Sequence, residues 1–143
     1  MKGFQRCLTL LLLMLLSGCA LFQEVGTADM VIHDGHQDMV TTIKDHVEKT
    51  EELYDTIVIA AEDQILVSYK VHHLNRFKMK SIEKKLEKWL QEKYPDKTVD
   101  LSSDYKIFLE SHKLMTKWKN NEVTKEEAEK KLDKIVKLKN EMT

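Results

Sequence analysis

The spacing of apolar residues along the chain predicts two helices before residue 94. In residues 36–53, Val40, Ile43 and Val47 recur at helical intervals with polar residues between them. Residues 78–93 show the same period, with apolar positions at Met79, Ile82, Leu86, Trp89 and Leu90. Both stretches are therefore expected to bury one face and to expose the other.

Two further helices are predicted nearer the C-terminus. One covers residues 104–119, and Ser102, Ser103 or Asp104 would cap it, because their side-chain oxygens accept hydrogen bonds from free backbone N–H groups. Its apolar face carries Tyr105, Phe108, Leu109, His112 and Met115. The last helix opens at Thr124 with a capping-box pattern. Its stripe is Ala128, Leu132, Ile135 and Val136.

Shorter apolar runs between these helices predict three strands. Residues 54–60 are rich in β-branched side chains, and residues 65–72 alternate between apolar and polar positions. The alternation places Ile65, Val67, Tyr69 and Val71 on one face and Ser68, Lys70 and His72 on the other. Residues 61–64 would turn the chain into a hairpin, and residues 98–102 supply the third strand. The second strand is expected to be half-buried, with its polar face in solvent.

The predicted order of elements is α-β-β-α-β-α-α, which belongs to the α+β class. We expect a small three-stranded sheet with helices covering one of its faces. Residues 36–143 hold these elements, and about 108 residues are enough to build one core without disulfides. Residues 19–35 show no sustained period and contain Gly26 and Gly35, so a linker is expected there.

Residues 1–18 have the features of a secretory signal peptide. Lys2 and Arg6 precede an apolar stretch, residues 7–16, whose length of about ten residues is typical of signal-peptide cores. A helix that spans a bilayer needs about 20 residues, so this stretch is too short. No later stretch approaches that length, and no transmembrane helix is predicted.

The residues that end this segment, Leu16-Ser17-Gly18-Cys19, resemble a bacterial lipobox. In such signals the Cys thiol attacks a lipid donor and forms a diacylglyceryl thioether, and small residues before it admit a peptidase. The resemblance implies that Cys19 becomes the mature N-terminus and carries acyl chains such as palmitate, two of which anchor a protein stably. The alternative is an ordinary signal peptide that happens to contain a Cys.

The cysteines and charges exclude several classes of protein. Cys7 and Cys19 are the only cysteines, so the folded domain has neither a disulfide framework nor a Cys-rich metal site. Without Lys2 and Arg6, 21 of the 23 basic residues remain against 24 acidic ones, a net charge of about −3. A mildly acidic domain is a poor match for nucleic acid, and no nucleic-acid partner is expected.

The segment from Asp55 to Phe108 resembles the YhcN/YlaJ family of sporulation lipoproteins. The similarity lies in a strand, an acidic turn, the strand "ILVSYKV", a Lys-rich helix and the segment "VDLSSDYKIF". It implies a non-enzymatic lipoprotein of the spore envelope, held in a forespore or spore membrane through the diacylglyceryl group on Cys19. It also implies a role in outgrowth or germination and a partner among other envelope or spore proteins. The alternative is a housekeeping envelope lipoprotein that binds a small ligand or a wall polymer.

Histidines give only weak candidates for metal binding. His33 and His36 lie near Asp34 and Asp38, and imidazole with carboxylate suits several divalent ions, but the expected linker would not fix their geometry. His72 and His73 are adjacent on a strand and would point to opposite faces. His112 is expected at the margin of the core. No metal site is predicted.

The remaining charged residues show no catalytic pattern. The carboxylates near predicted turns are Asp55, Glu62, Asp63, Asp96, Asp100 and Asp104. Their spacing defines no acid–base pair, and the chain has no Gly-rich phosphate loop, nucleophile elbow or HExxH motif, so we predict neither an enzyme nor a cofactor. A basic helix face carries Lys78, Lys80, Lys84, Lys85 and Lys88, interrupted by Glu83 and Glu87. That face is either a solvated surface or a contact for an anionic surface.

Overall fold

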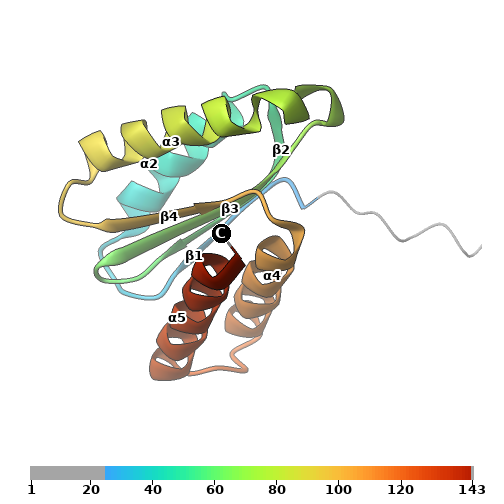
Figure 1. The fold of residues 1–143 in the computed structure, drawn as a ribbon. Helices are drawn as coiled ribbons and strands as arrows, with labels where there is room; N and C mark the ends of the chain where they lie inside the picture. The colour runs from blue at the N-terminus through green and yellow to red at the C-terminus, as the bar shows by residue number, and fades with distance from the viewer. Residues whose placement is uncertain (1–24, 143) are drawn as a thin grey trace, which may run out of the picture.

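Nine elements of regular structure make up residues 25–142, the part of the chain that the computed structural model describes. In chain order they are β1 (Thr27–Val31), α2 (Gln37–Glu48), β2 (Leu53–Ala60), β3 (Gln64–Val71), the 3-10 helix η2 (His73–Lys78), α3 (Met79–Lys93), β4 (Thr98–Ser102), α4 (Tyr105–Lys119) and α5 (Lys125–Met142). The strands form one sheet between two pairs of helices (Figure 1). Helices α2 and α3 cover one face, and α4 and α5 cover the other.

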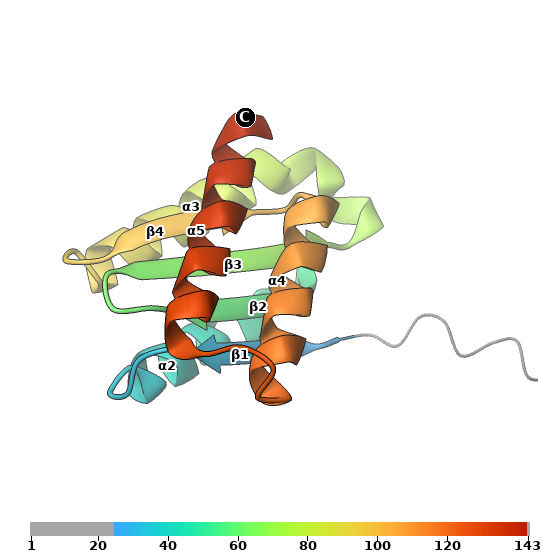
Figure 2. The same ribbon diagram turned by 90° about the horizontal axis from the view of Figure 1, so that it is seen from below.

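The sheet has the order β1-β2-β3-β4. Strands β1 and β2 are parallel, β2 and β3 form an antiparallel hairpin, and β3 and β4 are again parallel. A parallel pair needs a crossover connection, and helices α2 and α3 provide the two crossovers. The sheet is therefore built from two successive β-α-β units joined by a hairpin, with α4 and α5 crossing its other face (Figure 2).

The predicted α+β class is confirmed, but the expectation of three strands covered on one face is wrong. The additional strand, β1, lies inside residues 19–35, where a linker was expected, and pairs with β2 from Thr27 to Val31. The observed order is β-α-β-β-α-β-α-α. Strand β1 is short, and its conformation depends on pairing with β2, a partner distant in sequence.

Two apolar cores explain why both faces of the sheet are covered. The core under α2 and α3 includes Val40, Ile43, Val58, Val67, Tyr69, Leu86 and Leu90. The core under α4 and α5 includes Met30, Ile57, Ile59, Leu66, Phe108, Leu114 and Leu132. Adjacent residues of β2 and β3 enter opposite cores, since successive side chains of a strand point to opposite faces.

Most of the predicted helices are confirmed, with two corrections. The first predicted helix, α2, ends at Glu48 and not at residue 53. Helix α4 buries Ile107, Phe108, Ser111, Leu114 and Met115, so its buried face is rotated from the predicted one. Tyr105 and Leu109 of the predicted face are exposed.

Both predicted helix caps form hydrogen bonds. Asp104 accepts the backbone N–H groups of Lys106 at 2.7 Å and of Ile107 at 3.2 Å. The Thr124 N–H donates to Glu127 at 2.9 Å, and the Glu127 N–H donates to the Thr124 hydroxyl at 3.3 Å. These local signals fix where α4 and α5 begin.

Ser68 corrects the prediction that β3 has a solvated face. Its side chain lies on the face covered by α4 and α5 and is fully buried. Among residues 25–142, its hydroxyl oxygen has no hydrogen-bond partner. A buried hydroxyl without a partner costs free energy, because it gave up water on folding and gained no bond in return.

We expect Ser68→Ala to stabilise the protein by about 1 kcal/mol, because the change removes this unpaired hydroxyl from the core. Urea denaturation measures the free energy of unfolding. Ser102→Ala is the matched control, since Ser102 is also buried in a strand but accepts the Asp104 N–H at 3.2 Å. Ser102→Ala should lower the free energy of unfolding, whereas Ser68→Ala should raise it. A loss of stability in Ser68→Ala would show that the hydroxyl does have a partner.

Candidate functional site

Cys19, the predicted lipidation site, lies outside the described residues, so the structure does not report its surroundings. The structure does show how the described part of the chain enters the sheet. Gly26 precedes β1 at the end of the sheet where β2 starts and β3 stops, as the pairs Thr27–Thr56 and Leu53–Val71 require. We call this the proximal end, defined by Gly26, the first residues of β2, the last residues of β3, and η2 (Figure 1).

A buried carboxylate joins three segments at the proximal end. Asp55 of β2 accepts the Gly26 N–H at 2.8 Å through one oxygen and the Lys70 ammonium at 3.0 Å through the other. Its side chain is only 3% exposed. Gly26 has a φ of 65°, in the left-handed region that favours glycine. The Asp55 carboxylate therefore fixes the first residue before β1 relative to the end of β3.

Aromatic rings surround the ammonium group of Lys70. Its nitrogen lies 4.3 Å from the ring centroid of Phe108, 5.6 Å from that of Tyr105 and 5.7 Å from that of Tyr54. Ring faces attract cations, and the Lys70 side chain is 22% exposed, so it keeps part of its hydration. The lysine thus depends on Asp55 as its counter-ion, and the pair holds α4 against the hairpin.

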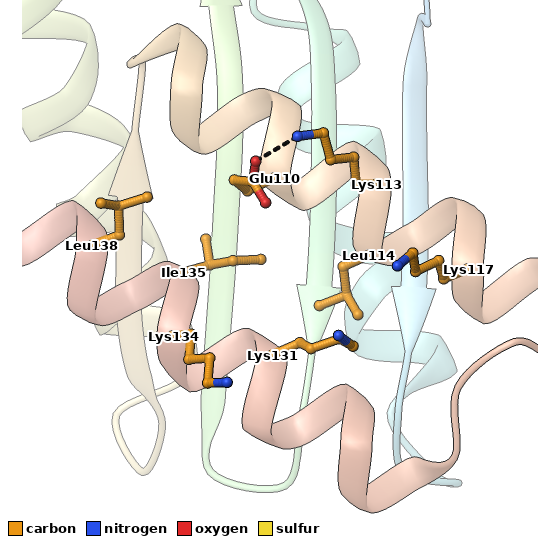
Figure 3. Close-up of a pocket in the computed structure, with 8 residues that line it drawn as sticks. All are labelled: Glu110, Lys113, Leu114, Lys117, Lys131, Lys134, Ile135 and Leu138. Carbon is orange, nitrogen blue, oxygen red and sulfur yellow. Dashed lines mark hydrogen bonds and ion pairs between the residues drawn. The ribbon is translucent and has the colours of Figure 1, made fainter.

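A second candidate lies between α4 and α5, in a groove of about 260 Å³ (Figure 3). We call it the lysine groove, and its lining residues are Glu110, Lys113, Leu114, Lys117, Lys131, Lys134, Ile135 and Leu138. The apolar side chains come from both helices and lie between the charged ones. Lys113 pairs with Glu110 at 2.7 Å.

The chemistry of the lysine groove favours an anion with an apolar part. Lys117 and Lys131 extend from opposite helices into the same part of the groove, where one anionic group would meet both charges (Figure 3). Leu114 and Ile135 offer an apolar surface beside them. Three of its four lysines have no carboxylate partner within 4 Å among residues 25–142, so the rim is positive in a domain of negative net charge.

The histidines considered as metal ligands are not brought together. The His33 ring contacts Glu129 through Nε2 and lies 3.6 Å from Glu62 through Nδ1, which ties the loop after β1 to α5. His36 instead sits at the start of α2. Within residues 25–142, no group of three or more His, Cys, Asp or Glu side chains has the arrangement of a metal site.

His112 lies where it was predicted, but His72 and His73 do not lie on a strand, because β3 ends at Val71 and His73 begins η2. His72 and His73 are exposed after the end of β3, and the His72 ring lies 4.9 Å from that of Tyr54. His112 is half-buried on α4, at the margin of the core. Their positions give them no shared ligand.

The two buried carboxylates among the six candidates each bind a lysine of another element. Asp55 pairs with Lys70, and Asp100 pairs with Lys139 of α5 at 2.7 Å while accepting the Gln64 amide at 3.1 Å. Asp104 caps α4. The others, Glu62, Asp63 and Asp96, are exposed in turns. Asp55 and Asp100 thus hold elements together, and of these two pairs only that of Asp55 with Lys70 follows from the register of the predicted hairpin.

Two titratable groups with displaced pKa values lie against α2 and α3. Burial, followed by the nearby Glu83 carboxylate, raises the pKa of Tyr69 well above its usual value, and the Tyr69 hydroxyl donates to Glu83 at 3.3 Å. Burial, followed by Lys49, lowers the pKa of His46, whose ring stacks on Trp89 at 3.7 Å. In both groups burial disfavours the charged form, and both side chains contact α3, which gives them a structural role.

The basic face predicted for residues 78–93 lies on α3, except that Lys78 is the last residue of η2. Its lysines are exposed, and Lys88 lies 3.7 Å from Glu92. The exposure of these lysines is compatible with both interpretations of the face, a solvated surface and a contact for an anionic surface.

None of the helices within residues 25–142 is both long and apolar enough to cross a membrane. Comparisons of the chain with models of protein families, with curated proteins and with solved structures found no match.

Proposed function

We propose that this chain is a lipid-anchored, non-enzymatic lipoprotein of the spore or cell envelope, acting in sporulation. The observation that carries the proposal is the motif Leu16-Ser17-Gly18-Cys19 directly after a signal-peptide core. The resemblance of residues 55–108 to YhcN/YlaJ proteins supports the sporulation role. The lysine partners of the buried Asp55 and Asp100 support a non-enzymatic domain, because these carboxylates are engaged in holding the fold.

In this proposal the lipid anchor and the folded domain have different roles. The acyl chains on Cys19 hold the protein at the membrane, and the domain presents surfaces to another envelope or spore protein. The α4/α5 face is the preferred docking surface, since it carries the lysine groove. A role in outgrowth or germination would follow from the partner that the domain holds at the membrane.

A second candidate is a housekeeping envelope lipoprotein that binds an anionic wall polymer. The lysine groove favours it, because Lys117 and Lys131 supply convergent positive charge above an apolar floor. Repeated phosphates along a polymer would meet such a rim at several points. The time of expression separates this candidate from the first, as described next.

We expect Cys19→Ala to move most of the protein out of the membrane fraction, because the thiol that forms the thioether is lost. The measurement is fluorescence microscopy of a C-terminal fusion through growth and starvation, with fractionation of the same cells. Cys7→Ala is the matched control, since Cys7 lies in the predicted signal segment and should leave the membrane signal unchanged.

The time course decides between the two candidates. Signal confined to the forespore supports the sporulation role, whereas signal around growing cells supports the housekeeping alternative. A membrane pattern that Cys19→Ala leaves unchanged would contradict the lipid anchor.

A further inference from the structure

The turn η2 carries the two most exposed large apolar side chains found in residues 25–142. Leu74 is 83% exposed and Phe77 is 82% exposed. No residue of η2 is buried, so these side chains do not contribute to either core. Exposing two large apolar groups on one six-residue turn is costly in water and often marks an interaction site.

This turn lies at the proximal end, beside the start of the described chain. It follows β3 directly, and β3 is two strands away from β1 in the sheet, which corresponds to about 10 Å. The Asp55 carboxylate fixes this arrangement by bonding both Gly26 and Lys70. Both ribbon views show η2 and the start of β1 at the same end of the sheet (Figures 1 and 2).

The length of chain before the domain limits how far this end can lie from an anchor on Cys19. Residues 20–24 separate Cys19 from Val25, and a fully extended chain of that length reaches at most about 20 Å. A membrane that holds Cys19 is therefore within reach of the proximal end. The opposite end of the sheet, with Asp63 and Asp96, would face away from it.

The composition around the turn suits the surface of a bilayer. From Lys70 to Ile82 the chain has no acidic residue, and Arg76, Lys78 and Lys80 flank the apolar tips. Tyr54 and Tyr105, 37% and 60% exposed, lie at the same end, and tyrosine is enriched at membrane interfaces. Apolar tips flanked by basic side chains are typical of segments that lie in the interface of anionic membranes.

The acidic side chains at this end do not belong to the turn. Asp104 caps α4, Glu52 accepts the His72 N–H through its backbone carbonyl at 2.8 Å, and Glu51 precedes it in the connection before β2. The turn itself thus contains no acidic side chain, and beside Leu74 and Phe77 it carries His73, Asn75, Arg76 and Lys78.

We propose that η2 is a second membrane contact, which inserts Leu74 and Phe77 into the interface of the bilayer that holds Cys19. The contact orients the domain, with the proximal end on the lipid and the hairpin turn at residues 61–63 pointing outward. The inference rests on the proposed lipid anchor and adds an orientation that an anchor alone does not impose.

The test uses the full-length lipidated protein in vesicles that contain anionic lipid. In the proposed lipoprotein the Cys19 thiol is consumed in the thioether and Cys7 is removed with the signal, so Phe77→Cys introduces one free thiol for an environment-sensitive fluorophore. Asp96→Cys, exposed at the opposite end, is the matched control. With quencher-bearing lipids, we expect quenching at position 77 to exceed that at position 96 roughly threefold, since interfacial segments lie about 5–10 Å deep. Adding Leu74→Asn to the Phe77→Cys variant should reduce the difference in quenching between positions 77 and 96.

The outcomes separate this inference from the anchor. Protein that floats with the vesicles but is quenched equally at both positions would overturn the insertion of η2 and leave the anchor intact. Protein that does not float with them would overturn both. Because Leu74 and Phe77 are exposed, thermal melting of the labelled variants should match that of the unaltered protein.

Discussion

Asp55→Ala should destabilise the protein by about 3 kcal/mol, because it breaks a buried ion pair from one side. The change leaves the Lys70 ammonium among three aromatic rings without a counter-ion, and it removes the acceptor of the Gly26 N–H. The Lys70 side chain is 22% exposed, so water recovers part of its solvation and the cost stays at the lower limit for such pairs. Urea denaturation followed by circular dichroism measures the loss.

Two controls define what Asp55 contributes. Asp55→Asn keeps an oxygen for the Gly26 N–H and loses only the charge, so it should cost less than Asp55→Ala. Asp96→Ala removes an exposed carboxylate and should change stability by less than about 0.5 kcal/mol. Equal stability of Asp55→Ala and Asp96→Ala would mean that the pair with Lys70 does not hold the proximal end.

The same substitution bears on the proposed orientation at the membrane. The bond from Gly26 to Asp55 sets where the chain leaves the sheet, and the bond from Lys70 sets the end of β3, just before η2. Loss of the carboxylate would loosen both positions together. Stability and orientation at the proximal end therefore depend on one side chain.

Local patterns predicted the helices because their information is local. The stripes of α3 and α5 recur at helical intervals, and the buried residues Ile82, Leu86, Leu132 and Ile135 belong to them. Caps at Asp104 and Thr124 depend on hydrogen bonds across two or three residues. The sequence of a few helical turns is therefore enough to predict where these helices begin and which face they bury.

The sheet was predicted less well because its pairing is not local. Strand β1 is only five residues long, and its conformation depends on its five residue pairs with β2. A usable signal did exist for the second covered face. The nearly unbroken apolar run from Ile57 to Ala61 is typical of a strand buried on both sides. The alternation in β3 favoured one solvated face, and the burial of Ser68 contradicts it.

The candidate sites show the same difference between local features, which the sequence predicts, and features that depend on distant residues. The resemblance to a lipobox is carried by four contiguous residues, Leu16 to Cys19, so it is visible in the sequence alone. The partnership of Asp55 with Lys70 follows from the predicted hairpin, since its register places these residues opposite each other. The exposure of Leu74 and Phe77 depends on how η2 leaves the sheet, and apolar residues by themselves predict burial. The lysine groove requires α4 and α5 to lie side by side.

Leu132→Ala should also cost about 3 kcal/mol, because truncating a buried leucine removes apolar contacts and leaves a cavity. Leu132 of α5 is 1% exposed and packs in the core that contains Ile57, Leu66 and Phe108. Urea denaturation of this variant beside Asp133→Ala, an exposed neighbour on the same helix, gives the comparison.

The contrast between these neighbours tests the third layer of the fold. If α5 covers the second face of the sheet, only the Leu132 variant loses stability, because Asp133 faces solvent. A cost below about 1 kcal/mol for both would mean that α5 is a surface helix, as the expected one-faced sheet allowed. The lysine groove would then lose one of its walls, and the preferred docking surface with it. The stability of Leu132→Ala thus tests whether α5 is packed firmly enough on the sheet for the α4/α5 face to serve as a docking surface.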